Sequence, residues 1–118
     1  MDIEEIIKAF FEATNKRDLK AMDDLFSDGV EFSFPKTQPL IGKERVLRFF
    51  AILFRQYPHL TFQVHMTITE TDRAAVHWTN KGANRRGEAY ENEGVTILRL
   101  ENSKICFLSD FFKDTGKF

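Results

Sequence analysis

Apolar side chains recur at helical spacing in the first sixty residues. Between residues 3 and 15 they appear every three or four positions among charged residues, which predicts an amphipathic helix. A short second helix is expected from the capping residue Asp18 to Phe26, with Ser27-Asp28-Gly29 as its end. A third helix is predicted over residues 46–57, closed by Pro58, and a short strand over residues 30–34 lies between the second and third helices.

From residue 60 onward the period changes from three or four to two. Four long strands are predicted over residues 60–70, 74–84, 88–99 and 104–113, and polar turns join them into an antiparallel meander. Gly82 and Gly94 lie inside strands, where glycine usually marks a bulge or a bend. We therefore expect a single α+β domain over residues 1–118, with three helices packed on a strongly curved, mostly antiparallel sheet that encloses a pocket.

Composition narrows the chemistry of that pocket and its partners. Thirteen Phe against two Tyr and one Trp provide much ring surface with few polar atoms, which suits a dry core or cavity wall. A net charge of -1 disfavours nucleic acid and anionic membranes as partners. Cys106 is the only cysteine, so no internal disulfide can form, and no signal peptide or membrane-spanning run is apparent. We expect a cytoplasmic protein.

Three stretches and the order of the elements resemble the nuclear transport factor 2-like superfamily. The stretches are Asp18 through Phe34, Gly42-Lys43-Glu44, and Glu91-Asn92-Glu93-Gly94-Val95 running into Lys104-Ile105. More narrowly, the chain resembles the SnoaL-like branch, which includes polyketide cyclases and has relatives among ketosteroid isomerases and limonene epoxide hydrolases. The resemblance implies a cone-shaped fold whose open end admits small apolar molecules, and a homodimer formed through the outer face of the sheet.

Asp110 is the first candidate for a catalytic residue. Strand alternation places it on one face with Cys106, Leu108 and Phe112, and a carboxylate among such neighbours loses hydration, which raises its pKa and suits it to general acid–base chemistry. In the SnoaL-like cyclases and the epoxide hydrolases that the chain resembles, an aspartate at the matching place in the last strand transfers protons. The alternative is a solvated or structurally satisfied aspartate.

Glu93 and Asn80 are the other catalytic candidates. Glu93 shares a strand face with Glu91 and falls where the ketosteroid isomerases carry the protonated acid of their oxyanion hole; the alternative is a charge on a solvated strand. Asn80 could orient a ligand or a water. Trp78, which alternates with Asn80, is either an aromatic wall of the pocket or an ordinary core residue.

The chain departs from its better-defined relatives at four positions. Phe34 occupies the place of the ketosteroid isomerase base, and Phe10 that of its oxyanion tyrosine. Trp78 and Asn80 stand where the limonene epoxide hydrolases carry an Arg and an Asp. The chain therefore lacks the base and the tyrosine that the ketosteroid isomerase mechanism requires, which disfavours steroid isomerisation. It also lacks the carboxylate pair with which the epoxide hydrolases activate water.

The expected ligand-binding residues are all aromatic, although Trp78 could equally be core and phenylalanines in such positions are more often core. They are Trp78, Phe10, Phe34, Phe54, Phe26 and Phe112. The histidines, at positions 59, 65 and 77, lack the spacing of metal ligands, and no glycine-rich phosphate loop occurs, so neither a metal nor another cofactor is expected.

Together these features predict a small-molecule enzyme of lyase, isomerase or cyclase type. Asp110 would shuttle a proton on an apolar, carbonyl-bearing substrate, and Glu93 or Asn80 would orient or stabilise the developing charge on its oxygen. The alternative is a noncatalytic domain of the same fold that binds a small ligand or serves only to dimerise.

Overall fold

The computed structural model of the chain describes residues 1–117, which form helices packed on one face of a sheet. The helices are α1 (Ile3–Lys16), α2 (Leu19–Leu25) and α3 (Lys43–Gln56). The strands are β1 (Phe26–Ser33), β2 (Leu40–Ile41), β3 (Thr61–Glu70), β4 (Arg73–Ala83), β5 (Ala89–Glu101) and β6 (Lys104–Phe112), followed by a short 3₁₀ helix, η1 (Thr115–Lys117). The predicted α+β class, the three helices and the four long strands are confirmed.

Side-chain caps explain where the first two helices begin. The Asp2 carboxylate accepts a hydrogen bond from the Glu5 backbone N–H at 2.9 Å, and the Glu5 carboxylate accepts one from the Asp2 N–H at 3.1 Å, which completes a capping box. Asp18 accepts from the Ala21 N–H at 3.0 Å and caps α2 as expected. Between the two helices Arg17 adopts φ 58°, which ends α1 and turns the chain.

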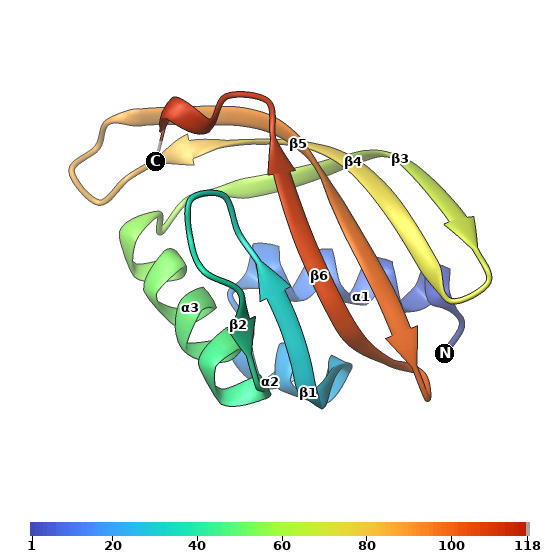
Figure 1. Cartoon of the computed structure of the whole chain (residues 1–118). Coiled ribbons are helices and arrows are strands. Elements are labelled where there is room, and N and C mark those ends of the chain that lie inside the picture. Colours follow the sequence, from blue (N-terminus) through green and yellow to red (C-terminus); the bar gives the residue numbers. More distant parts are fainter. Residues whose placement is uncertain (118) are drawn as a thin grey trace.

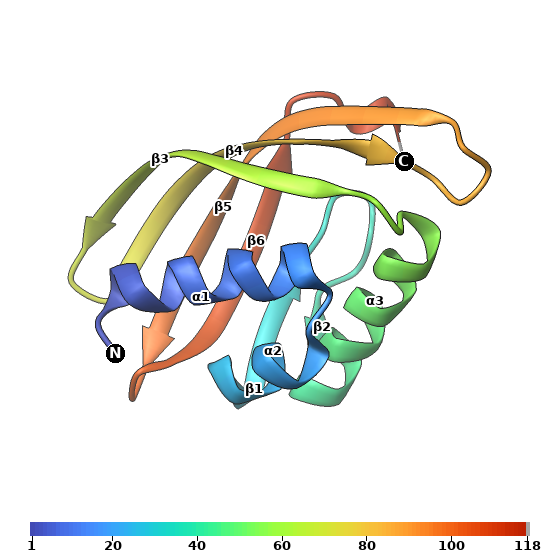
Figure 2. The ribbon, with the colours of Figure 1, turned by 180° about the vertical axis from the view of Figure 1, so that it is seen from behind.

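The six strands form a mixed sheet in the order β2-β1-β6-β5-β4-β3. Every neighbouring pair is antiparallel except β1 and β6, which are parallel. The long strands β3, β4 and β5 curve over the helices (Figure 1). Seen from behind, α1 and α3 lie under the concave side of the sheet (Figure 2). This arrangement leaves one sheet face against the helices, the inner face, and one facing away from them, the outer face.

The bulges lie at other positions than the sequence suggested. Pairing between β4 and β5 runs without interruption, so neither Gly82 nor Gly94 marks a bulge in this pairing, and the other expectation, a bend, stays a prediction. The register shifts instead in β1, β3 and at the β5–β6 pairing. Both glycines serve close approach: a Cβ at Gly94 would come within 2.8 Å of the Trp78 indole, and one at Gly82 within 2.6 Å of the His59 carbonyl oxygen.

Two strand ends also differ from expectation. Strand β1 begins at Phe26, so Ser27-Asp28-Gly29 lies in a strand that is bulged against β6 rather than ending the preceding helix. Near the start of β6 a bulge at Cys106 turns Ile105 into the core, where it is fully buried with Leu108. Simple alternation predicts that these two side chains lie on opposite faces. The prediction fails because a bulge shifts the alternation by one residue.

The core lies between the inner face and the helices. It joins Val76 and Trp78 of β4, Leu98 of β5 and Leu108 of β6 to the apolar stripe of α1, which includes Phe10. Within residues 1–117, none of the helices has the length and apolar character that a membrane crossing would require.

Candidate functional site

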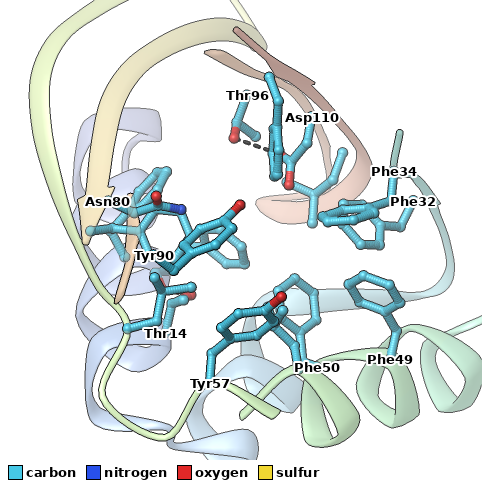
Figure 3. A pocket seen from close by; sticks show the side chains of 17 residues that line it. Thr14, Phe32, Phe34, Phe49, Phe50, Tyr57, Asn80, Tyr90, Thr96 and Asp110 are labelled. Atoms are coloured by element: carbon cyan, nitrogen blue, oxygen red, sulfur yellow. Dashed lines mark hydrogen bonds between the residues drawn. The ribbon is translucent and has the colours of Figure 1, made fainter. Parts of the chain in front are cut away.

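A narrow cavity opens between the inner sheet face and helices α1 and α3 (Figure 3). Its free space is about 30 Å³ when measured as the volume open to the centre of a water molecule. A single ordered water needs roughly 10–15 Å³ on this measure, so the cavity holds about two. Its walls are mainly aromatic, with rings contributed by Phe10, Phe32, Phe34, Phe49, Phe50 and Phe112.

Asp110 is the one carboxylate that lines this cavity among the residues the structure describes. It lies on β6 directly opposite Thr96 of β5, whose Oγ1 donates a hydrogen bond to Asp110 Oδ1 at 2.6 Å. Loss of hydration raises the pKa of Asp110 from 3.8 to about 7, although the hydrogen bond from Thr96 opposes the rise. A carboxyl group with this pKa both gives and takes a proton near neutral pH.

Trp78 supports this pair from behind rather than lining the cavity. Its side chain is fully buried, and its Nε1–H donates to Thr96 Oγ1 at 2.9 Å. The indole packs edge-to-face against Phe62 and Phe112, with ring centroids 4.9 and 5.3 Å away. The sequence offered two roles for Trp78, and its placement corresponds to the core role.

Asn80 lines the same cavity from β4 and is 3% exposed. Its Oδ1 is buried and has no hydrogen-bond partner among the side chains described, those of residues 1–116. An unsatisfied buried carbonyl oxygen costs about 1–3 kcal/mol. A bound molecule that donates a hydrogen bond to this amide would recover that free energy, so Asn80 is a natural polar contact for a ligand.

Two tyrosines complete the polar part of the wall (Figure 3). Burial raises the pKa of Tyr90 to about 12, so its hydroxyl keeps its proton at any physiological pH. Asn92 Nδ2 donates to the Tyr90 hydroxyl oxygen at 3.3 Å, and the Tyr57 ring lies 5.0 Å from the Tyr90 ring. No Lys, Arg or His of the described part of the chain lines the cavity.

The structure brings five of the predicted site residues together around the cavity. They are Asp110, Asn80, Phe10, Phe34 and Phe112. Phe26 lies in the closed core, 1% exposed, while Phe54 packs against Phe50 without reaching the cavity.

Glu93 does not join them, because it points from the outer face. His77 Nε2 donates to its carboxylate at 2.7 Å and Lys113 Nζ at 3.3 Å. These two hydrogen bonds hold the pKa of Glu93 below its usual value, and the bond from His77 contributes most. A deprotonated, solvated glutamate cannot act as the protonated donor of an oxyanion hole, so Glu93 leaves the candidate site.

Thr96, Tyr90, Tyr57 and Thr14 also line the cavity, and sequence reasoning missed them. A signal existed for two of these residues. Tyr90 and Thr96 alternate with Glu93 along β5, so they occupy whichever face Glu93 does not. Choosing the face that carries Gly94, opposite Trp78, would have found both.

Comparisons with known proteins agree with this architecture. The family model of the SnoaL-like domain matches residues 7–108, and the chain belongs to that family. An NTF2-like protein of unknown function from Burkholderia pseudomallei K96243 has a similar structure, with a TM-score of 0.88, 19% identity, and coverage of 97% of this chain and 92% of that one. Among curated proteins, no sequence matches significantly.

Two further solved structures are similar to this chain, one described as a SnoaL-like polyketide cyclase and one by its ketosteroid isomerase-like fold. A proposed SnoaL-like polyketide cyclase from Jannaschia sp. CCS1 has a TM-score of 0.84 at 21% identity, covering 92% of this chain and 83% of that one. A hypothetical protein with a ketosteroid isomerase-like fold from Catenulispora acidiphila DSM 44928 has a TM-score of 0.83 at 16% identity, covering 91% and 84%. At these identities the likeness establishes the fold alone.

Over residues 1–117, His, Cys, Asp and Glu side chains nowhere form a group of three or more that could hold a metal ion. The polar groups on the cavity wall include the Asp110 carboxyl, the Asn80 amide and the hydroxyl groups of two tyrosines and two threonines.

Proposed function

We propose that the chain is a small-molecule enzyme of isomerase, cyclase or lyase type in which Asp110 moves a proton on an apolar, carbonyl-bearing substrate. The observation that carries this proposal is a partly buried carboxyl with a pKa of about 7 on the wall of an aromatic cavity. Membership of the SnoaL-like family, and the cyclase named among its structural neighbours, support the same reaction class.

In the proposed reaction, deprotonated Asp110 removes a proton from a carbon next to the substrate carbonyl. The electron pair of the C–H bond moves toward the carbonyl oxygen and forms an enolate, and protonated Asp110 then returns the proton at a second position. The Nδ2–H group of Asn80, rather than its Oδ1, donates a hydrogen bond to the substrate oxygen while this charge develops. The aromatic walls exclude water, which keeps the proton between Asp110 and the substrate.

A chromogenic probe tests proton abstraction without knowledge of the substrate. In 5-nitrobenzisoxazole, a base removes the C3 proton, the N–O bond breaks, and a coloured cyanophenolate forms. We expect the protein to accelerate this ring opening with a rate that rises through about pH 7. Asp110→Asn should lower the rate by about 10²–10⁴-fold, which is the usual contribution of a positioned general base.

Glu93→Gln is the matched control, because it removes a carboxylate from the outer face of the neighbouring strand. Its rate should equal that of the unmodified chain. Equal rates for Asp110→Asn and the unmodified chain would overturn the proposal.

A second candidate function is favoured by the small size of the cavity. With room for about two waters, a larger molecule enters only if aromatic side chains at its mouth move. A noncatalytic domain is compatible with so small a cavity. It would bind a very small ligand there, or it would use only the outer face, to dimerise.

The outer face supplies the support for dimerisation. Met66, His77, Val95 and Phe111 form one continuous cross-strand row on it. Met66 and Phe111, together with Ile68 one row further, are 54%, 59% and 61% exposed, and we call these three residues the outer apolar patch. Exposed apolar surface of this kind is typical of protein–protein contacts. We therefore propose that a second copy of the chain covers the outer apolar patch.

A further inference from the structure

The hydrogen bonds that connect Trp78, Thr96 and Asp110 have one favoured direction. An indole N–H donates and never accepts, so Trp78 Nε1 must donate to Thr96 Oγ1. The single hydroxyl hydrogen of Thr96 is then directed to its other partner, Asp110 Oδ1, at 2.6 Å. A carboxylate can only accept, so Asp110 accepts at Oδ1 when it is charged. In the neutral acid, a proton on Oδ1 would have to use the second lone pair of Thr96 Oγ1 and would take from the Thr96 hydroxyl hydrogen the acceptor that it has in this structure, so Oδ2 is the favoured place for the proton.

The neighbouring backbone makes this chain of hydrogen bonds possible. Trp78 and Gly94 are cross-strand partners, and the missing side chain of Gly94 leaves room for the indole to lie over β5. Thr96 is two residues further along β5 on the same face, within reach of the indole nitrogen. Thr96 in turn is the cross-strand partner of Asp110.

We propose that Thr96, held by Trp78, is a positioning residue that fixes the orientation of the Asp110 carboxyl and confines its exchangeable proton to Oδ2. A catalytic role for this positioning rests on the proposed function, whereas the hydrogen bonds among Trp78, Thr96 and Asp110 do not depend on it. In the absence of the Thr96 hydroxyl the carboxyl could rotate and carry its proton on either oxygen. A general base works best when the reacting oxygen is held in place, because misplacement by about 1 Å can cost about 100-fold in rate.

The surroundings of Asp110 make Thr96 its main electrostatic partner. No cationic side chain of residues 1–116 lines the cavity, and the titratable groups that share its wall are Tyr57 and Tyr90. Burial raises the pKa of Tyr90 to about 12, so Tyr90 is uncharged over the range in which Asp110 titrates. A donated hydrogen bond stabilises the carboxylate more than the neutral acid, so Thr96 keeps Asp110 from becoming an even weaker acid.

The first test uses the single tryptophan of the chain, whose indole N–H gives one NMR signal. In the unmodified protein we expect the chemical shift of this proton to titrate with the same midpoint as the Asp110 carboxyl carbon. In Thr96→Val, which keeps the shape and removes the hydroxyl, the indole titration should disappear. The Asp110 midpoint should rise by about one pH unit, a tenfold change in proton affinity.

Thr96→Ser is the matched control, since it keeps the hydroxyl and loses only a methyl group. It should restore both the indole titration and an Asp110 midpoint within a few tenths of the original. A purely structural role for Thr96 would give the opposite ranking, because valine preserves the packing better than serine. An unchanged Asp110 midpoint together with a persistent indole titration in Thr96→Val would overturn the inference.

These NMR results need no substrate, so their failure is distinct from failure of the proposed function. If Thr96→Val behaves as expected while Asp110→Asn still opens 5-nitrobenzisoxazole at the original rate, the positioning role stands and the catalytic proposal falls. If instead the probe reaction depends on Asp110 but its pH–rate midpoint does not move in Thr96→Val, the positioning role is wrong.

Discussion

Asp110 and Glu93 stand on neighbouring strands of one sheet, yet they point from opposite faces into opposite environments. Asp110 faces the aromatic cavity with one hydroxyl donor and no cation, and its pKa rises to about 7. Glu93 faces outward, where His77 and Lys113 donate to it, and its pKa falls. The pleat of the sheet, which turns successive side chains to opposite sides, therefore decides which of two similar carboxylates can transfer a proton near neutral pH.

The largest expected effect on stability comes from neutralising the inner carboxylate. Because the folded-state pKa of Asp110 exceeds its unfolded value of 3.8, the folded chain binds more protons between about pH 4 and 7, and stability from this group is lost as pH rises through that range. At pH 8, Asp110→Asn should raise the free energy of unfolding by up to about 4 kcal/mol.

Urea unfolding of both proteins at pH 4.5 and pH 8 measures this effect. The advantage of Asp110→Asn should shrink toward the lower pH as Asp110 becomes protonated in the unmodified chain. An advantage that is equal at the two pH values would show that Asp110 is solvated like Glu93.

A side chain at position 94, where glycine now leaves room for the Trp78 indole, should have the next largest effect on stability. In Gly94→Ala the new methyl group would lie 2.5 Å from the Phe111 carbonyl oxygen and 2.8 Å from the Trp78 indole, and such overpacking costs about 1–3 kcal/mol. The displaced indole should also lose its hydrogen bond to Thr96, which a shift of its N–H signal reports. Gly29→Ala, where a Cβ meets nothing within 4 Å, is the control and should change neither quantity appreciably.

The outer apolar patch gives a smaller and separate effect. Replacing Met66 and Phe111 with lysine places charges on an apolar row, which should abolish self-association while leaving the fold intact. Sedimentation velocity over a range of concentrations measures this. The Asp110 titration should stay unchanged, and a protein that is monomeric before mutation would refute the proposed dimer.

The smallest effect is expected from neutralising the outer carboxylate. Glu93→Gln should leave the NMR titration midpoint of Asp110 within a few tenths of a pH unit, since the sheet separates the two groups and solvent screens Glu93. A larger displacement would mean that the two faces are electrostatically coupled.

The SnoaL-like fold and the main proton-transfer candidate could be predicted from the sequence. The change of period at residue 60 marked the passage from helices to the meander, and Asp18 was correctly identified as a helix cap. Asp110 emerged from its apolar neighbours and from the resemblance alike. The bulge at Cys106 was hidden, because bulges depend on how two strands pair and leave no clear mark in the pattern of either one.

By itself, the sequence determined which residues share a face wherever a strand runs without a bulge, as β4 does, since alternation is a local property of an extended backbone. It separated Glu93 from Thr96 and His77 from Trp78, but it could not say which set would be dry. That choice was made by the helices, which cover the face carrying Trp78, Thr96 and Asp110. Burial and the missing counter-charge then set the proton affinity of Asp110, and both exist only once distant segments have packed together.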